Sequence, residues 1–378
     1  MRICLVFDCL YPYTVGGGER WYRALAEGLS ARGRTVAYLT RLQWDPDSAA
    51  DVPGVDVIAV TPAMELYVHG RRSVSVQVRF AFGVFRHLLA HGGRYDVVQT
   101  PALHASLLAV LAARPFRRYR VVVDWFEVWT RDYWLAYLGP VAGRLGWLAQ
   151  GLTARSRHNA LCFSRLHARR LEEQGHRGRI TIVEGLSVLP SEDPDPALAE
   201  PLVVFAGRHI PEKHAPAVVA AVAQARERLP ELRAEIFGDG PDRQEVLRLI
   251  GEAGLDGAVS APGFAPADEV REKLRRALCH LFPSTREGYG LVVVEAASLG
   301  TPTIVVDSPD NAARELVVDG ENGVVVASTE PEALAEAIER IQAAGQTLRE
   351  SSAEWFRRNR KRLSLESGLD TLDDVYGR

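Results

Sequence analysis

The chain has 378 residues, more than the ~250–300 residues at which a single hydrophobic core stops growing, so we expect two domains. Hydrophobic residues make up 47% of the sequence and charged residues 25%, which is typical of a folded, soluble protein and excludes wholesale disorder. No apolar run reaches the ~18–20 residues that a membrane-spanning helix needs. The apolar start at Ile3–Leu10 is short and contains Asp8, unlike a secretory signal, so a cytoplasmic location is predicted.

Charge is distributed unevenly along the chain. Residues 1–190 carry 24 Arg against 15 acidic residues, whereas residues 191–378 carry 21 basic residues against 33 acidic ones. The opposite signs suggest two domains that face a shared cleft, or a basic half that meets an anionic partner. The alternative is an arginine-rich composition on a solvated surface. This alternative is supported by the composition itself, because 42 of the 45 basic residues are Arg.

The four cysteines are scattered, and no two of them form a CxxC pair. They are Cys4, Cys9, Cys162 and Cys279. This pattern favours reduced, packed thiols over a disulfide framework or a zinc site.

Strands and helices alternate along the first half of the chain. Arg2–Asp8 is a continuous apolar run, as in a strand buried on both faces of a parallel sheet, and Glu19–Arg32 has apolar residues at helical spacing. Further strands are predicted at Thr35–Thr40, Val55–Val60, Asp96–Gln99, Tyr119–Trp125, Ala160–Phe163 and Arg179–Val183, and helices at Val74–His91 and Ala102–Ala113. This alternation predicts an α/β fold with a doubly wound parallel sheet.

A proline-rich stretch interrupts the alternation. Four prolines between Pro190 and Pro201 prevent a helix or a central strand, so residues 191–201 are predicted to link two domains. Asp193 and Asp195 superficially resemble a metal-binding DxD pair, but the prolines favour an extended linker, and no metal site is predicted there.

The alternation then resumes over residues 202–352, the predicted second domain. Strands are expected at Leu202–Ala206, Ala234–Phe237, Leu278–Phe282, Thr303–Val306 and Val324–Val326. A last helical segment, interrupted near Gly368, is expected within residues 353–378. The sequence contains no repeat and no nucleic-acid-binding motif.

A glycine-rich loop follows the first predicted strand. Gly16, Gly17 and Gly18 allow close approach to the backbone, and the following helix start offers free N–H groups and a partial positive charge to an anion. The spacing differs from GxGxxG, which disfavours a dinucleotide-dependent dehydrogenase. A glycine turn without a ligand is the alternative.

Polar loops also follow the strands of the second half, where open α/β sheets bind ligands. Arg208 and Lys213 are five residues apart, a spacing that suits a diphosphate, although an ordinary charged surface loop is the alternative. Gly238 and the pair Gly263 and Phe264 mark turns at the ends of two further strands, which turn chemistry explains without a ligand.

The most informative segment is PSTREGYGLVVVEA, residues 283–296. Glu287 lies in its loop and Glu295 in the helix that follows. Eight helical residues span ~12 Å, too far for both carboxylates to serve one bond, but suitable for gripping two ends of an extended ligand. Gly288 and Gly290 expose backbone N–H groups at the helix start, where an anion can bind. The alternative interpretation of Glu287 and Glu295 is that they are two functionally unrelated glutamates.

In this order, the motifs GGGER, GRHIPEK, FGDGP, PGF and PSTREGYGLVVVEAASLGTP resemble the retaining glycosyltransferases of family 4. The similarity covers nearly all of the second half and the first forty residues. It implies a GT-B fold: two Rossmann-like domains facing a cleft, and a C-terminal helix that crosses back to domain one. The expected domains are residues 1–190 with 353–378 for the acceptor, and 202–352 for the nucleotide-sugar donor.

The resemblance also implies roles for individual residues. Arg208 and Lys213 match the pair that holds the donor diphosphate, and Glu287 matches the carboxylate at the sugar hydroxyls. Glu295 matches the residue at the ribose. The other positions that match donor-binding elements are Gly16, Gly17, Gly18, Gly238, Gly263, Phe264, Gly288, Tyr289, Gly290 and Leu291. Fixed cations stabilise a departing diphosphate electrostatically, so neither a metal nor a cofactor is expected beyond the nucleotide sugar itself.

One position departs from the family pattern. Relatives often carry a His where this chain has Phe126, in the segment after a strand of domain one. Other candidates for the acceptor side are His104, Asp124, Glu127 and Trp129, and His69 is a further substitute. The alternative for both His104 and His69 is an ordinary surface or capping role outside any site.

An apolar pocket without that His suits an acceptor that needs little deprotonation, such as a thiol, an amine or a flat heteroaromatic. We therefore expect transfer to a small molecule of specialised metabolism, through oxygen, sulfur or nitrogen. The alternative is that Phe126 is a neutral substitution of the expected His, in an enzyme that transfers to an ordinary sugar hydroxyl. The helix at Val74–His91 carries Arg79 and Arg86 among aromatic residues, so contact with an anionic membrane is a further, less favoured hypothesis than burial.

Two other classes of function stay open at this stage. One is a sugar-nucleotide epimerase or hydrolase on the same fold, and the other is a protein that binds sugar nucleotides without catalysis. The base of the donor, UDP or GDP, and the oligomeric state are not predicted by the sequence.

Overall fold

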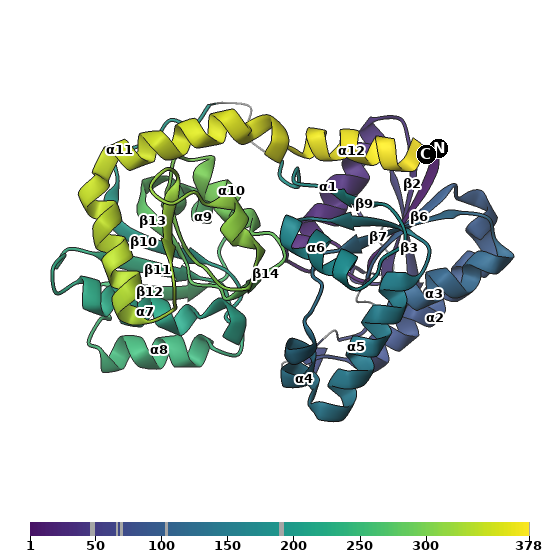
Figure 1. Cartoon of the computed structure of the whole chain (residues 1–378), viewed down its shortest axis with the longest axis horizontal. Coiled ribbons are helices and arrows are strands. Elements are labelled where there is room, and N and C mark those ends of the chain that lie inside the picture. Colours follow the sequence, from purple (N-terminus) through teal and green to yellow (C-terminus); the bar gives the residue numbers. More distant parts are fainter. Residues whose placement is uncertain (46–49, 66, 69–70, 103–104, 189–192, 378) are drawn as a thin grey trace. The chain divides into compact units, whose positions relative to one another are not determined.

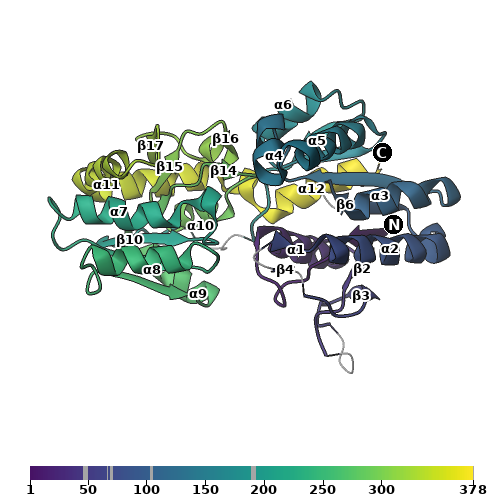
Figure 2. The same ribbon diagram turned by 90° about the horizontal axis from the view of Figure 1, so that it is seen from below.

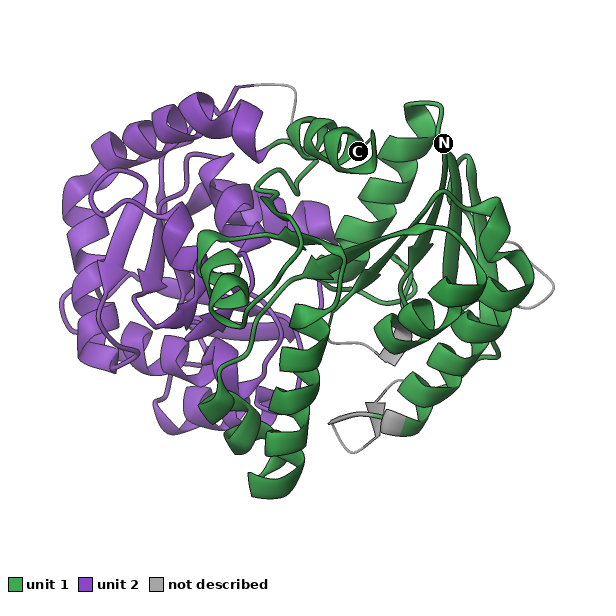
Figure 3. Cartoon of the chain, turned by 45° about the vertical axis from the view of Figure 1, so that its right-hand side comes forward, with its two compact units in different colours: residues 1–188, 364–378 green, residues 189–363 purple. Residues whose placement is uncertain are grey.

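A computed structural model describes residues 1–378 except 46–49, 66, 69–70, 103–104, 189–192 and 378. The chain divides into two compact units (Figure 3). Unit 1 comprises residues 1–188 and 364–378, and unit 2 comprises residues 189–363.

Unit 1 contains a seven-stranded parallel sheet in the order β3-β2-β1-β6-β7-β8-β9. Its strands are β1 (Arg2–Val6), β2 (Thr35–Arg41), β3 (Val55–Thr61), β6 (Val97–Pro101), β7 (Arg120–Trp125), β8 (Asn159–Cys162) and β9 (Ile180–Ile182), and a small antiparallel pair joins β4 (Tyr67–Val68) to β5 (Arg71–Arg72). Each predicted strand of this half is therefore confirmed to within a few residues. Continuous apolar runs predicted them well because both faces of the sheet are covered.

The helices of unit 1 lie on both faces of this sheet. They are α1 (Gly17–Ala31), α2 (Val74–His91), α3 (Ala105–Ala113), α4 (Arg131–Leu138), α5 (Pro140–Arg155), α6 (Arg165–Glu173) and α12 (Leu365–Gly377), with short 3-10 turns η1 (Gly92–Arg94) and η2 (Arg114–Phe116). Side chains of α2, α3, α5 and α6 share one core with β1 and β7. The C-terminal α12 lies beside α1 (Figures 1 and 2).

Several contacts attach α12 to α1 and to the residues just after it. Arg32 forms ion pairs with Asp370 and Asp373, and Arg34 forms another with Asp373. Leu369 packs so closely on Gly28 that a Cβ at that position would collide with it. The C-terminal segment is thus an integral part of unit 1.

Unit 2 contains a six-stranded parallel sheet in the order β12-β11-β10-β13-β15-β17. Its strands are β10 (Glu200–Ala206), β11 (Arg233–Phe237), β12 (Val259–Gly263), β13 (Ala277–Phe282), β15 (Thr303–Val306) and β17 (Gly323–Val326), and β14 (Arg286–Glu287) pairs with β16 (Asp310–Asn311). The edge strand β12 was not predicted. Its segment VSAPG contains a proline and alternates between buried and exposed residues, unlike the apolar runs of the inner strands.

Helices cover both faces of this second sheet. They are α7 (Ala215–Ala225), α8 (Arg243–Glu252), α9 (Ala267–Arg276), α10 (Leu291–Ala297) and α11 (Pro331–Leu363), with 3-10 turns η3 (Pro211–Lys213) and η4 (Ala312–Leu316). One core joins α7, α8 and α11 to the sheet, and a second core on the other face joins α9 and α10 (Figure 1).

The boundary between the last two helices differs from the prediction. Helix α11 continues in unit 2 to Leu363, so residues 353–363 belong there and not with domain one. Arg357 donates to the carbonyl of Pro194, and Arg360 pairs with Asp193, which attaches this part of the helix to the linker. The interruption falls at Ser364, whereas Gly368 lies inside α12.

Candidate functional site

Three loops of unit 2 meet where β10, β11 and β12 end. The amide of Gly207 donates to the carbonyl of Phe237 at 3.1 Å, and the amide of Gly238 donates to the carbonyl of Gly263 at 2.8 Å. A third backbone hydrogen bond joins these loops, from the amide of His209 to the carbonyl of Asp239. Predicted positions far apart in the sequence are therefore neighbours at one edge of the sheet.

The close approach of these loops requires glycine. At Gly238 φ is +118°, and a Cβ would collide with the carbonyl oxygen of Gly207. At Gly240 φ is +152°, and a Cβ would collide with the carbonyl oxygen of His209. Side chains other than hydrogen are thus excluded on steric grounds at both positions.

A second set of contacts ties the first loop to the segment after β13. Lys213 in η3 forms an ion pair with Glu287 in β14. The amide of Thr285 donates to the carbonyl of Glu212 at 3.0 Å, and Arg286 pairs with the carboxylate of Glu212 at 3.4 Å. The cation and the carboxylate that the sequence singled out therefore lie in direct contact.

The Lys213 and Glu287 side chains are largely enclosed, with 16% and 12% of their surfaces exposed. The ammonium group also lies 5.4 Å from the ring centre of Phe282, the last residue of β13. Arg208, by contrast, is exposed. The site thus combines one held cation with one whose side chain reaches solvent.

The remaining predicted donor residues lie at the start of α10 and after the end of β12. Gly290 precedes α10 with φ of +107°, Leu291 is the first residue of the helix, and Glu295 lies one turn further on and is partly exposed. Tyr289 is buried. Phe264, after the end of β12, is 66% exposed, so its ring is available to a ligand.

Several polar residues of this edge were missed by the sequence analysis. His214 has φ of +50° and contacts the hydroxyl of Thr285 at 3.0 Å, and Asn311 donates to the carbonyl oxygens of Ser284 and Val306. Burial lowers the pKa of His209 and of His214, which favours their neutral forms. The φ of His214 and the register of β14 with β16 carry no simple signal in the sequence.

In unit 1 the glycine loop lies at the carboxyl end of β1. Gly16 directly precedes α1, and its extended backbone lies against the carboxylate of Glu19, which a Cβ would meet. A Cβ at Gly18 would come within 3.1 Å of the Phe7 ring. The glycines of this loop add no side chains at the helix start, and the carboxylate of Glu19 lies against Gly16, the first of them.

Asp124, a candidate for the acceptor side, is completely buried at the end of β7. Its two oxygens accept hydrogen bonds from the amide of Gln99 at 2.8 and 2.9 Å. Gln99 in turn accepts a hydrogen bond from the hydroxyl of Tyr376 on α12. Burial raises the pKa of Asp124 to about 7, although the polar groups of Gln99, Tyr22 and Trp21 oppose this rise.

Phe126 belongs to an aromatic cluster at the same edge of the sheet. Its ring stacks on Phe163 with centroids 4.8 Å apart, and Tyr22 lies 6.3 Å away. Tyr22 also stacks on Phe7 beneath the glycine loop. The residue that replaces the expected His is therefore part of a packed apolar wall.

Trp129 and the carboxylate of Glu127 lie just after Phe126 in the sequence. The indole of Trp129 donates to the carboxylate of Glu127 at 2.7 Å and packs against Tyr133, Trp134 and Tyr137. Glu127 and Trp129 are thus close to each other, as expected from the sequence. His104 and His69 lie outside the described residues.

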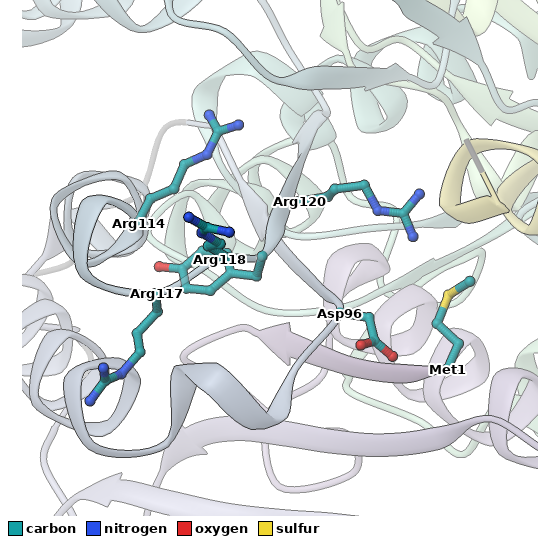
Figure 4. Close-up of a pocket in the computed structure, with 7 residues that line it drawn as sticks. Met1, Asp96, Arg114, Arg117, Arg118 and Arg120 are labelled. Atoms are coloured by element: carbon teal, nitrogen blue, oxygen red, sulfur yellow. The ribbon is translucent and has the colours of Figure 1, made fainter.

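A groove of about 680 Å³ lies at the opposite edge of the sheet of unit 1, where the strands begin (Figure 4). Its lining residues are Met1, Asp96, Arg114, Arg117, Arg118, Tyr119 and Arg120. Arg2 donates to Asp96 and lowers the pKa of that carboxyl. The groove is separated by the length of the strands from the glycine loop.

Among the described residues, no group of three or more His, Cys, Asp and Glu side chains is arranged to hold a metal ion. The four cysteines are buried free thiols. No helix in the described part of the chain is long and apolar enough to cross a membrane.

Two parallel, Rossmann-like sheets with glycine-rich loops at the carboxyl ends of their strands define the architecture of GT-B glycosyltransferases. Residues 16–185 match the family described as "Glycosyl transferase 4-like domain", and residues 191–362 match "Glycosyl transferases group 1". The chain belongs to these family 4 type glycosyltransferases.

Curated relatives match parts of the chain. An alpha-D-kanosaminyltransferase of Streptomyces kanamyceticus is 30% identical over 37% of this chain and 36% of its own length. The lipopolysaccharide core biosynthesis glycosyltransferase LpsE of Rhizobium meliloti is 31% identical over 47% and 48%. The chain matches less than half the length of these relatives.

Solved structures match the fold over almost the whole chain. The sucrose-phosphate synthase of Thermosynechococcus elongatus superposes with a TM-score of 0.83, 20% identity and coverage of 99% and 98% of the two chains. Anabaena HepE in complex with UDP and glucose superposes with a TM-score of 0.77, 16% identity and coverage of 100% and 99%. At these identities the likeness establishes the fold.

Proposed function

We propose that this protein transfers a sugar from a nucleotide-diphosphate sugar to a small acceptor molecule, with retention of the anomeric configuration and without a metal ion. The observation that carries the proposal is the enclosed ion pair of Lys213 with Glu287, at a sheet edge that also carries Arg208 and the amide groups before α10.

The proposed mechanism separates charge stabilisation from sugar recognition. Breaking the anomeric C–O bond leaves an oxocarbenium-like carbon and adds negative charge to the diphosphate. Arg208 and Lys213 stabilise that charge, and the backbone amides of Gly290 and Leu291 bind phosphate oxygens. Lys213 and the two amides are held by the fold before the reaction, so they need little reorganisation in the transition state, whereas the exposed Arg208 is ordered by the donor.

Recognition of the rest of the donor is assigned to neighbouring residues. Glu287 accepts hydrogen bonds from sugar hydroxyls, and Glu295 binds those of the ribose. Gly263 and Phe264 hold the base, and the Gly16–Gly18 loop contacts the diphosphate from domain one. The departing phosphate takes the proton of the acceptor as the new bond forms on the same face of the sugar.

The acceptor side is proposed from the aromatic wall of unit 1. Phe126 offers no proton-transferring group, which suits an acceptor of low pKa or one that stacks, so transfer to sulfur or nitrogen is included beside transfer to oxygen. The kanosaminyltransferase among the relatives supports transfer of a sugar, and the UDP complex of HepE supports a UDP-sugar as the first donor to test.

Ligand-induced stabilisation provides the first experiment. UDP, GDP and dTDP are compared by thermal shift, and the nucleotide of the natural donor should raise Tm most, since it binds the native state. Arg208→Ala should reduce that shift, whereas Arg271→Ala, an exposed arginine on α9, should leave it unchanged. If no nucleoside diphosphate stabilises the protein, the proposal fails.

Turnover with the matching sugar nucleotide then separates the classes of function. Retention is checked by NMR of the anomeric proton in the product, and independence of metal by an unchanged rate in EDTA. Free sugar or an epimer formed without any acceptor would indicate a hydrolase or epimerase. Donor binding without turnover across oxygen, sulfur and nitrogen acceptors would indicate a non-catalytic binding protein.

A further inference from the structure

Exposed apolar side chains are concentrated in one part of unit 1. Of the 20 large apolar residues that are exposed in the described part of the chain, 16 lie in unit 1. Seven of these are on the hairpin of α4 and α5: Tyr137, Leu138, Val141, Leu145, Trp147, Leu148 and Leu152. Scattered single residues need no explanation, but such a group on two adjacent helices marks an interaction surface.

Helix α5 turns its large apolar side chains toward the outside of unit 1. Its buried residues are Gly143, Gln150 and Ala154, whereas every Val, Leu and Trp of the helix is exposed. A helix that only covered its own domain would place these large side chains inward. The outward stripe therefore needs a partner that unit 1 itself does not supply.

The stripe is regular and firmly held. Val141, Leu145, Leu148 and Leu152 follow steps of four, three and four residues, which places them on one side of the helix, and each is 53–73% exposed. On the inner side, Gly143 and Gly146 fit against Trp134 so closely that a Cβ at either position would collide with it. The hairpin thus presents its apolar side chains from a packed support. Figure 1 shows α4 and α5 side by side.

The buried Gln150 fastens the base of the hairpin. Its side-chain oxygen accepts hydrogen bonds from the backbone amide of Trp129 and from the indole of Trp134, both at 3.1 Å. Its amide group donates to the carbonyl of Trp129 at 2.9 Å. These bonds connect α5 to the segment that carries the acceptor-side candidates.

Charge identifies the kind of partner. From Tyr133 to Leu171 the sequence contains six Arg and no Asp or Glu. Arg144 and Arg155 are exposed on α5, and Arg131 lies 5.9 Å from the ring of Trp147. Asp132 at the start of α4 is the one acidic residue of the hairpin. Trp and Tyr beside an apolar stripe, with arginines in excess of carboxylates, match the boundary between the acyl chains and anionic headgroups of a bilayer.

The arginine groove extends this basic surface. Arg114, one of its lining residues, donates to the carbonyl of Arg157, just beyond the end of α5. In the part of the chain that the structure describes, Arg114, Arg117, Arg118 and Arg120 form no ion pair, so their charges remain for an external anion. Phe116 among them is 64% exposed.

We propose that unit 1 docks on an anionic lipid bilayer through the α4–α5 hairpin, with α5 lying in the plane of the membrane. The stripe of Val141, Leu145, Leu148 and Leu152 enters the acyl boundary, and the arginines face the headgroups. The surface differs from the helix at Val74–His91, where Val76 and Phe80 are buried in the core. Docking places the segment 126–130, which directly precedes α4, near the lipid surface.

A second copy of the chain is a less suitable occupant of the stripe. Pairing two such helices would bring the arginines of both copies together with no carboxylate on either helix to balance them. A lipid surface with anionic headgroups supplies that balance. The two occupants are distinguished by experiment.

Vesicle sedimentation of the full chain tests the proposal, with vesicles of phosphatidylcholine alone and of about three parts phosphatidylcholine to one part phosphatidylglycerol. The wild type should bind the anionic vesicles, and added salt should weaken binding. Leu145→Ser/Leu148→Ser should lower the partition constant by ~10-fold or more, because two large apolar side chains no longer enter the lipid. Leu198→Ser/Leu247→Ser, two exposed leucines of unit 2, should bind as the wild type does.

Three results would overturn this assignment. They are a wild type that does not sediment with anionic vesicles, a Leu145→Ser/Leu148→Ser variant that binds equally well, and a dimer in light scattering that this variant converts to monomers. Circular dichroism confirms that the variants are folded, which is expected since both leucines are exposed. Vesicle binding requires neither donor nor acceptor, so its failure is distinct from failure of the proposed transfer.

Discussion

The strand ends of the two units carry opposite kinds of chemistry. In unit 2 the loops after β10, β11 and β13 present an ion pair, an exposed arginine and glycines with positive φ. In unit 1 the strand ends are lined by stacked aromatic rings above a buried Asp124. The same architecture thus supports a charged site in one unit and an apolar wall in the other.

Under the proposed function, the two units have different tasks in sugar transfer. In the proposed transfer, unit 2 binds the donor diphosphate, whose charge is the same for every donor, and unit 1 recognises the acceptor by shape and apolar contact. Changes in unit 2 should therefore act on catalysis, and changes in unit 1 on stability and on the choice of acceptor.

The largest effect is expected at the ion pair of unit 2. Lys213→Met should lower kcat/KM by ~10²–10³-fold, because a cation aimed at the leaving diphosphate is lost. The ion pair of Lys273 with Glu235, on α9 and β11, provides a matched control, and Lys273→Met should retain the wild-type rate. Equal losses in both variants would show that the effect comes from the fold and not from the site.

The next effect concerns Asp124 and the pH dependence of stability. Its pKa is raised to about 7 in the folded state, against ~3.9 for an unfolded chain, so the folded state binds the extra proton between these values. The contribution of Asp124 is fully present below pH ~4 and is lost as the pH rises through about 7, on the order of 4 kcal/mol.

Urea unfolding of the wild type and of Asp124→Asn from pH 4 to 8 measures this contribution. The wild type should lose stability relative to the variant as the pH rises, because Asn cannot be deprotonated. Curves that stay parallel across this range would contradict the raised pKa. Donor-induced stabilisation should be similar in both proteins, since Asp124 lies in unit 1.

A backbone effect of intermediate size is expected at Gly238. Gly238→Ala should destabilise unit 2 by about 1–3 kcal/mol, because φ is +118° and the new Cβ meets the carbonyl of Gly207. Gly251→Ala in α8 is the matched control: nothing lies near its Cβ, and alanine should stabilise the helix by about 0.5–1 kcal/mol. Chemical unfolding should give opposite signs, and equal signs would refute the steric argument.

The smallest effect is expected at Phe126. Phe126→His removes the stacking on Phe163 and should cost about 1 kcal/mol of stability, with the rate toward the natural acceptor unchanged or slightly lower. Phe126→Leu separates loss of the ring from gain of the imidazole. A large gain in rate for the His variant with a sugar-hydroxyl acceptor would show that the wall is not adapted to acceptors that need little deprotonation.

Local patterns in the sequence were sufficient to predict the main strands and the break between the two α/β halves. The roles of individual residues in donor binding stay predictions. The apolar runs at Arg2–Asp8 and Leu202–Ala206 correspond to β1 and β10, because strands buried on both faces have continuous apolar sequences. Arg208, Lys213 and Glu287 were singled out because each follows a strand that was itself easy to recognise.

Long-range contacts were not predictable in this way. Tyr376 bonds to Gln99 across 277 positions of the sequence, and the chain of hydrogen bonds to Asp124 exists only because α12 returns to unit 1. Apolar spacing on α5 indicates a helix with one apolar side, but the direction in which that side faces is a property of the packing. Only the folded structure shows its leucines pointing outward.

The sequence by itself determined the two α/β units, the break between them and the kinds of groups at the strand ends, since these depend on residues close together in the chain. The tertiary structure alone decided which of those groups meet. Lys213 and Glu287 pair across 74 positions, because parallel strands bring their carboxyl ends to one edge wherever they stand in the sequence. It also decided that Asp124 is buried and that the leucines of α5 are exposed, because burial depends on what covers a residue and not on its neighbours in the chain.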